Sequence, residues 1–310
     1  MYPRAGADAP SGSPPPSLVP ITILLDAAML NAAIRNAALF GSILLGALLV
    51  GGTAGGFASL RGVAGPTIGF AESPVRGIVL LVLALVPTAV MAIVVGRIFN
   101  AVVGCFVVGA ALAALSMRFG TIEDFAFAAG SPIGAAIETT IWAVVVAVLA
   151  FVVFVGSGPL PDLHRRRSSW VAELADSTAA IFLAAAAVAV PVVWFVVQTP
   201  AKGQALGGTI LAGAAVGFVG RLLAPRTQPI LLFATPVLAG AAAMLIGAFG
   251  AGPGIADAFV DGSLSRLAYP MPIDWAAGGL CGVAIGLGWA RGFVKEDPAP
   301  TPSLKRAIHG

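Results

Sequence analysis

Long apolar runs recur along the whole of this 310-residue chain, and short polar connections separate them. An α-helix rises 1.5 Å per residue, so a run of about 20 apolar residues matches the hydrocarbon core of a bilayer. One such run, TTIWAVVVAVLAFVVFVG at 139–156, holds no charged side chain. The pattern predicts an all-α polytopic membrane protein.

The composition supports this class. Charged residues make up 10% of the chain, hydrophobic residues 58%, and the mean hydropathy is +0.98. A soluble domain carries about 25% charged residues, so this chain cannot build a water-facing surface all round. We expect eight transmembrane helices, near 37–57, 77–96, 99–117, 134–156, 178–198, 204–220, 229–249 and 275–293.

The positive charges predict an orientation for these spans. Loops that hold most of the Lys and Arg residues stay on the cytoplasmic side. With eight spans, twelve of the 17 Lys and Arg residues lie on the side that carries both termini. We therefore expect cytoplasmic termini, in a bacterial cytoplasmic (inner) membrane. The opposite side collects acids, namely Glu72, Glu123, Asp124, Asp257, Asp261 and Asp274.

The two halves of the chain share short patterns in the same order. These pairs are NAALF (36–40) with TAAIF (178–182), VVGR (94–97) with FVGR (218–221), and IEDF (122–125) with IADAF (255–259). Four spans per half would give two copies of the same orientation, the parallel kind of repeat. The alternative is chance similarity between Gly- and Ala-rich segments. We predict a 4+4 parallel internal repeat.

This repeat divides the chain into four parts. Residues 1–20 form a disordered cytoplasmic tail rich in Pro, Ser and Gly, and 295–310 form a second cytoplasmic tail. The first membrane half covers 21–158 and the second 159–294, each opening with an amphipathic lead-in at the interface. The second lead-in carries Arg165, Arg166 and Arg167, which we assign to lipid headgroups or to plain positive-inside anchoring.

Small residues at helical spacing predict close helix packing. Lipid tails give helices no hydrophobic reason to associate, so backbones approach through small residues. The glycines at this spacing are Gly51 and Gly55, Gly213 and Gly217, and Gly278, Gly282 and Gly286. Pro87, Pro191 and Pro236 lie inside expected spans and predict kinks there. These kinks do not correspond between the halves, which weighs against a transporter built on broken helices.

Known catalytic and metal-binding patterns are missing from the sequence. The two histidines, His164 and His309, lie outside the expected spans, and no HExxH, CxxC or GxSxG motif occurs. Cys105 and Cys281 lie within spans and imply no disulfide framework. The basic residues form no patch typical of nucleic-acid binding. We expect no enzyme, metal or cofactor, and no nucleic-acid partner.

Glu138 is the acid nearest to the middle of a span. An acid within a span is by default a functional hypothesis, and Thr139, Thr140 and Asn100 are the polar residues that would continue a proton or solute path. Glu138 lies close to the start of its helix, however, where water and the helix dipole tolerate a carboxylate. We favour a structural or interfacial role. Asp274 is read as a helix N-cap.

Two functions remain open. The first is a small-solute or ion permease with two similar halves, by analogy with other duplicated polytopic folds. The second is a non-catalytic membrane subunit or scaffold that docks partner proteins through its Gly-rich helix faces. The expected partners are the lipid bilayer and either another membrane protein or a second copy of the chain.

Overall fold

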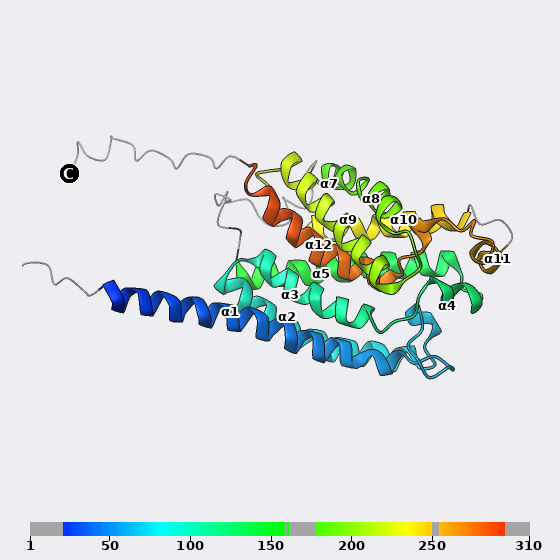
Figure 1. The fold of residues 1–310 in the computed structure, drawn as a ribbon, viewed down its shortest axis with the longest axis horizontal. Coiled ribbons are helices and arrows are strands. Elements are labelled where there is room, and N and C mark those ends of the chain that lie inside the picture. The colour runs from blue at the N-terminus through cyan, green and yellow to red at the C-terminus, as the bar shows by residue number, and fades with distance from the viewer. Residues whose placement is uncertain (1–20, 159, 161–177, 250–253, 295–310) are drawn as a thin grey trace, which may run out of the picture. The chain divides into compact units, whose positions relative to one another are not determined.

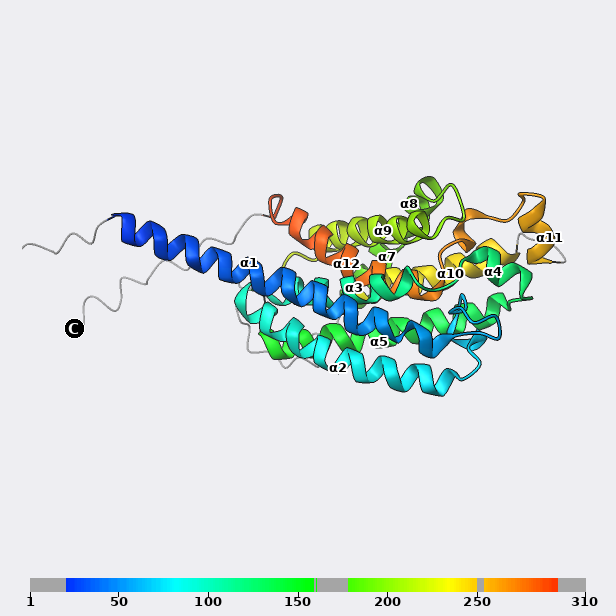
Figure 2. The same ribbon diagram turned by 60° about the horizontal axis from the view of Figure 1, so that its bottom comes forward.

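The computed structural model describes residues 21–158, 160, 178–249 and 254–294. Two units are distinguished, one up to Ala38 and one from Leu39, and the packing below belongs to the second. Helices and turns make up the described residues, with one isolated β-bridge between Ala58 and Ala64. The helices are α1 (Ile21–Gly52), α2 (Pro74–Ile98), α3 (Ala101–Ser116), α4 (Ile122–Phe127), α5 (Pro132–Ser157), α7 (Thr178–Ala186), α8 (Ala189–Val196), α9 (Lys202–Leu223), α10 (Thr235–Phe249), α11 (Ile255–Val260) and α12 (Pro272–Ala290). Figures 1 and 2 show their arrangement.

Seven helical segments in the described residues are long and apolar enough to cross a bilayer. Each coincides with one of the expected spans, so the polytopic membrane class is supported. The remaining expected span, 99–117, corresponds to α3, which has 16 residues. At 1.5 Å per residue, α3 measures ~24 Å and falls short of a full crossing. The count of eight therefore stays a prediction.

Two proline predictions have different outcomes. The span that contains Pro191 is interrupted: α7 ends at Ala186, and α8 begins at Ala189. Proline lacks the N–H that would bond the carbonyl of residue 187, so the helix breaks beside it. The prediction of a kink at Pro236 is wrong. A 3₁₀ turn at Leu231–Phe233 precedes α10, and Pro236 is the second residue of that helix, where proline costs no hydrogen bond.

The two interfacial lead-ins can be placed only in part. Residues 21–35 belong to α1, which runs without a break into the first expected span. The second lead-in, 163–177, lies outside the described residues, as do both tails. An interfacial position for either segment stays a prediction.

Helix α12 is the most enclosed helix of the bundle. It packs against α9, α3, α5 and α10, and 83% of its apolar window is buried, compared with 33% for α2 and 39% for α5. The outward faces of α2 and α5 are apolar, with Leu83 65% and Val144 61% exposed. Exposed apolar side chains on long helices are what a lipid environment requires. The bundle thus has a lipid-facing periphery around α12.

Glycines bring α9 and α12 into backbone contact. A Cβ on Gly217 would lie 2.6 Å from the carbonyl oxygen of Val283, and one on Gly278 would lie 2.6 Å from the backbone carbon of Thr209. Gly213, Gly282 and Gly286 face the opposite helix in the same way. Close backbone approach of this kind gains dispersion energy where lipid offers no hydrophobic drive. On the first span, Gly51 faces Ala114 of α3, whereas Gly55 has open space beside it.

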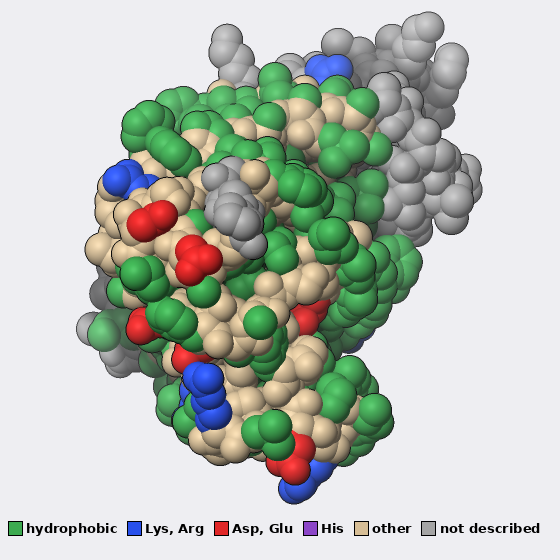
Figure 3. Space-filling view, turned by 90° about the vertical axis from the view of Figure 1, so that its right-hand side faces the viewer, with side chains coloured by type: hydrophobic (Ala, Val, Ile, Leu, Met, Phe, Trp, Pro, Cys, Tyr) green, Lys and Arg blue, Asp and Glu red, His purple; other side chains and the backbone are tan. Residues whose placement is uncertain are grey.

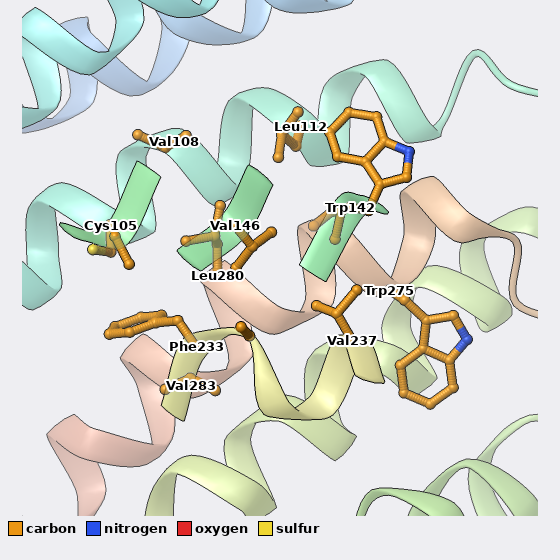
Figure 4. Packing of buried hydrophobic residues seen from close by; sticks show 14 of the residues in the cluster. Cys105, Val108, Leu112, Trp142, Val146, Phe233, Val237, Trp275, Leu280 and Val283 are labelled. Carbon is orange, nitrogen blue, oxygen red and sulfur yellow. The ribbon is translucent and has the colours of Figure 1, made fainter. Parts of the chain in front are cut away.

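The apolar core lies where α3, α5, α10 and α12 meet. Figure 4 shows Leu112 of α3, Trp142 of α5 and Leu280 of α12 packed together with Val237 of α10, all of them buried. Both cysteines are buried and unbonded to each other.

The short helices α4 and α11 lie at the same end of the bundle (Figure 1), where Phe127 and Phe259 pack edge to face at 6.0 Å. Asp124 caps α4 by accepting the Thr121 N–H at 2.9 Å. Figure 3 shows this end, with its acidic and basic side chains at the surface. The exposed acids in this region of the chain are Glu72, Glu123, Asp257 and Asp261. We call it the α4/α11 end.

The α9–α12 contact gives a first prediction. Gly217→Ala should lower the stability of the bundle by ~1–3 kcal/mol, because the added methyl group meets the backbone of Val283. Gly207→Ala is the matched control on the same helix, since nothing lies within 4 Å of its Cβ position. Thermal unfolding in detergent measures both. Equal melting temperatures for the two variants would contradict the assigned contact.

Candidate functional site

The amino end of α12 begins inside the protein. Met271, fully buried, precedes Pro272 at the first helical position, where proline is favoured. Asp274 follows in the first turn, and one of its carboxylate oxygens accepts the Met271 N–H at 2.8 Å. The side chain of Asp274 is 0% exposed. A carboxylate here is favoured by the helix dipole, yet it is removed from water.

Lys202 supplies the opposite charge. Its ammonium lies 2.8 Å from the second carboxylate oxygen of Asp274. Lys202 is the first residue of α9, an end of the helix where the dipole disfavours a cation. Its ammonium also donates to the carbonyl of Gly120 at 3.2 Å. The contacts with Asp274 and with the Gly120 carbonyl therefore offset the unfavourable position of a lysine at the start of α9.

A third segment completes the group. The Ser116 hydroxyl, at the end of α3, donates to the same oxygen of Asp274 that Lys202 contacts. Thr209 of α9 adds a hydrogen bond of 2.9 Å from its hydroxyl to the backbone carbonyl of Asp274. We refer to Ser116, the Gly120 carbonyl, Lys202 and Asp274 as the Asp274 cluster. It joins α3 and the residues after it to α9 and α12.

Burial makes this cluster energetically demanding. A single charge taken from water into a protein interior costs several kcal/mol, and a partner recovers that cost only with good geometry and further hydrogen bonds. The Asp274 carboxylate has three such partners, namely Lys202 and Ser116 within the cluster and the Met271 N–H. Removing one charged partner is therefore far more disruptive than its single contact suggests.

Glu138 has a different kind of partner. It lies six residues after Pro132, the first residue of α5, and both of its carboxylate oxygens accept the backbone N–H of Ile68, at 3.1 and 3.0 Å. In the described part of the chain, no ion pair joins Glu138 to a cation. The carboxylate thus holds the connection between α1 and α2 against α5.

That connection, residues 58–73, is folded against the α4/α11 end. The Gly120 N–H donates to the Gly65 carbonyl at 3.2 Å, and Phe70 packs against Phe125 of α4 with ring centroids 5.9 Å apart. A Cβ on Gly65 would lie 2.6 Å from that of Phe70, so only glycine fits there. Glu138 and Gly120 therefore fix this segment from two sides.

The other residues of the expected polar path are not brought together. Asn100 caps α3 by accepting the Val103 N–H at 3.1 Å. The neighbouring Arg97 donates to the Gly156 carbonyl at 2.8 Å, which places this end of α3 beside the far end of α5. Gly156 is eighteen residues beyond Glu138, or ~27 Å along the helix. Asn100 and Glu138 therefore lie at opposite ends of the bundle.

The two threonines after Glu138 point to different surroundings. Thr139 is buried and donates to the Ala135 carbonyl at 2.7 Å, whereas Thr140 is exposed and donates to the Ala136 carbonyl at 2.9 Å. Each hydroxyl is used by its own helix, as is common for threonine in apolar helices. They form no continuous polar path with Glu138.

The remaining predicted residues add no further site. Arg165, Arg166 and Arg167 lie outside the described residues. Within the described ranges, no group of three or more His, Cys, Asp or Glu side chains is arranged to hold a metal ion. The Asp274 cluster is thus the densest buried arrangement of charge and hydrogen bonding described.

The prediction that Asp274 is the N-cap of its helix is wrong. Met271 is the N-cap, and Asp274 is the third residue of α12, from which its carboxylate accepts the Met271 N–H. No sequence pattern indicated the partner of Asp274. In the predicted topology, Lys202 is one of the five Lys and Arg residues on the acidic side. The two residues are far apart in the chain, and no local spacing connects them. The available signal was the lysine itself, a cation at the start of an otherwise apolar helix on the side with few cations.

Comparison of the chain with protein-family models, curated proteins and solved structures finds no match.

The contact of Glu138 gives a second prediction. Glu138→Gln should speed hydrogen exchange at the Ile68 amide about tenfold, because the charged acceptor, worth ~1.4 kcal/mol, is replaced by a neutral one. Thr140→Val, on the exposed face of the same helix, should leave this amide unchanged. Hydrogen exchange of peptides that cover residues 65–72, followed by mass spectrometry, measures the exchange rate of the Ile68 amide in each variant. A normal rate in Glu138→Gln would show that the carboxylate does not hold the segment.

The buried ion pair gives a third prediction. Lys202→Met should lower the free energy of unfolding by ~3–5 kcal/mol, because it leaves the Asp274 carboxylate buried without a counter-charge. The double variant Lys202→Met/Asp274→Asn should recover most of this loss. Unfolding in mixed detergent micelles measures the free energy of unfolding of the wild type, of each single variant and of the double variant. Additive effects of the two substitutions would contradict a direct coupling between the side chains.

Proposed function

We propose that this protein is a small-solute or ion permease with two similar four-helix halves, and that it has no enzymatic activity. The Asp274 cluster is the observation that carries the proposal. An ionisable pair inside a membrane bundle is costly to keep and marks solute or ion pathways in many membrane proteins. This pair is buried where segments from both halves of the chain meet.

The order of the helices supports the repeat. In the first half, two long helices and a third helix are followed by the two-turn helix α4 and then α5. In the second, α7 and α8 together, α9 and α10 are followed by α11 and then α12. The packing partners correspond as well, since α3 packs on α12, α10 packs on α5, and α4 packs on α11. A pseudo-two-fold axis along the membrane normal would relate such halves.

The cluster belongs to the seam between the halves. Ser116 and the Gly120 carbonyl come from the first half, and Lys202 and Asp274 come from the second. Trp275 follows Asp274 in the chain, and its indole lies against Gly240 of α10. Its buried N–H has no hydrogen-bond partner among the described residues. A buried donor without an acceptor is uncommon in native proteins. The Trp275 N–H is therefore a hydrogen-bond donor to which a polar solute can bind.

The charge distribution supports the proposed orientation. At the α4/α11 end, the four exposed acids outnumber the three exposed cations, Arg61, Arg76 and Arg118. Of the helices that run away from this end, α2 and α9 hold Arg97 and Arg221 in their last turns, and Arg226 and Arg291 follow the ends of α9 and α12. Lys and Arg residues gather on the cytoplasmic side of membrane proteins. We therefore propose cytoplasmic termini and a bacterial inner membrane, with the Asp274 cluster toward the outer side.

The alternative is a scaffold that docks partners through glycine faces. Gly213, Gly217, Gly278, Gly282 and Gly286 are in contact within the chain, between α9 and α12. These glycines cannot receive a partner without separating the two helices. The packing therefore favours the permease over the scaffold.

Transport by the purified protein is the fourth prediction. Proteoliposomes should take up at least one member of a panel of labelled amino acids, sugars and carboxylates faster than empty liposomes do, under an imposed pH gradient. Asp274→Asn should reduce that uptake at least tenfold, because the seam loses its ion pair.

Asp261→Asn is the matched control for this measurement. Asp261 is an exposed acid at the same end, and hydrogen bonds from the Ser263 side chain and backbone N–H lower the pKa of its carboxyl. The control therefore removes one negative charge from the same end without touching the seam, and its uptake should be normal. Absence of uptake across the panel, together with a stoichiometric partner in mild detergent, would favour the scaffold.

A further inference from the structure

The connection between α1 and α2 contains a hairpin with an apolar tip. The Ser59 N–H donates to the Val63 carbonyl at 2.8 Å, and the Gly62 N–H donates to the Ser59 carbonyl at 2.8 Å. Leu60, at the tip, is 90% exposed, and Val63 is 62% exposed. Turns in water are dominated by Gly, Asn, Asp, Ser and Pro, so leucine at this tip indicates other surroundings. We call residues 58–64 the Leu60 hairpin.

The base of the Leu60 hairpin is fixed to the protein. Phe57, directly before it, is fully buried, and its ring packs against that of Phe119 with centroids 5.2 Å apart. Ala58 forms a β-bridge with Ala64, and its carbonyl accepts the Glu72 N–H at 2.9 Å. Because the hairpin is short and closed at its base, its tip cannot turn back into the apolar core. A cover for Leu60 must come from outside the chain.

Helix α2 places this base at the level of the bilayer surface. Arg76 and Arg97 flank twenty uncharged residues, 77–96, which measure ~30 Å and match the hydrocarbon core. Arg76 therefore lies at the boundary of the core at the α4/α11 end. Glu72, which is bonded to Ala58, precedes Arg76 by four residues. The headgroups add ~5–7 Å beyond the core on each side, so the hairpin starts within the headgroup layer.

Lipid also reaches the start of α2 from the side. Val75, Val79 and Leu83 lie four residues apart on one face of the helix and are 71%, 52% and 65% exposed. They belong to the lipid-facing periphery of the bundle. Figure 1 shows the connection between α1 and α2 at the edge of the bundle, next to the ends of these two helices. The hairpin is thus continuous with a surface that lipid covers.

The charge at the tip fits a phospholipid. Arg61 follows Leu60, is exposed, and forms no ion pair with an acid of the described residues. A guanidinium binds phosphate oxygens in bidentate fashion, and basic residues beside apolar ones are typical of segments at the membrane interface. We propose that the Leu60 hairpin is a membrane anchor, in which Leu60 and Val63 enter the boundary between headgroups and acyl chains and Arg61 binds a phospholipid phosphate.

Fluorescence quenching tests the position of the tip. The protein with Leu60→Cys carries a bimane label in nanodiscs of phosphatidylcholine and phosphatidylglycerol, and the wild type, whose two cysteines are buried, is the labelling blank. Phospholipid with a nitroxide at carbon 5 of its acyl chain should lower the emission about twofold, because interfacial apolar side chains lie at the depth of the first acyl carbons. Acrylamide, a quencher dissolved in water, should have little effect.

Two label positions calibrate this result. Leu83→Cys, on the exposed face of α2, should be quenched more strongly by a nitroxide at carbon 12 than by one at carbon 5. Asp261→Cys, at an exposed acid of the α4/α11 end, should be quenched by acrylamide and not by either lipid. Val63→Cys is a second label position on the hairpin and should behave as Leu60→Cys does.

A charge reversal tests the phosphate contact. With the label at Val63→Cys, Arg61→Glu should remove most of the quenching by the carbon-5 lipid, because phosphate repels the new carboxylate. Arg118→Glu is the matched control, since Arg118 is an exposed cation at the same end outside the hairpin. It should leave the quenching unchanged.

Three results would overturn the proposal. Quenching of the Leu60 label by acrylamide and not by lipid would place the tip in water. Protection from both quenchers would show that a protein, either a partner or a second copy of the chain, covers it. Equal quenching in Arg61→Glu and Arg118→Glu would reject the phosphate contact. None of these measurements requires a transported solute, so they stand independently of the uptake experiment.

Discussion

The architecture depends on the close approach of two backbones. Lipid does not drive helices together, so α9 and α12 adhere through surfaces without side chains, where Gly217 lies against Val283 and Gly278 against Thr209. This contact leaves space around α12 for α3, α5 and α10 as well. Because α12 is enclosed by these helices, its first turn is also buried, and the Asp274 carboxylate lies in that turn.

Once a polar group is inside the bundle, it must find a partner there. The chain meets this requirement in three ways. The hydroxyls of Thr139 and Thr140 donate hydrogen bonds to carbonyls of their own helix. Glu138 accepts a backbone N–H from the segment that connects α1 to α2. Asp274 forms an ion pair with Lys202. Only the last of these joins opposite charges. Ser116, which donates to Asp274, and the Gly120 carbonyl, which accepts from Lys202, connect this pair to the first half of the chain.

The membrane class and the approximate positions of seven of the eight expected spans could be predicted from the sequence, because apolar run length reflects bilayer thickness directly. The interruption beside Pro191 was likewise visible as a lost hydrogen bond, whereas Pro236 was misjudged because a helix start was placed too early. The partner of Asp274 could not be predicted. Lys202 reaches it only through the packing of α9 on α12, a tertiary contact that no sequence period encodes. For the same reason, the separation of Asn100 from Glu138 follows only from the fold.

The enclosed position of α12 has a consequence for how the protein is made. Helix α12 has a mean hydropathy of 1.3, the lowest among the seven candidate spans in the described residues. An aspartate in its first turn makes entry into lipid less favourable still. Its integration into the bilayer therefore relies on α3 and α9 being already in place, with Ser116 and Lys202 ready to receive the acid. Insertion of α12 thus depends on recognition of its neighbouring helices more than on its affinity for lipid.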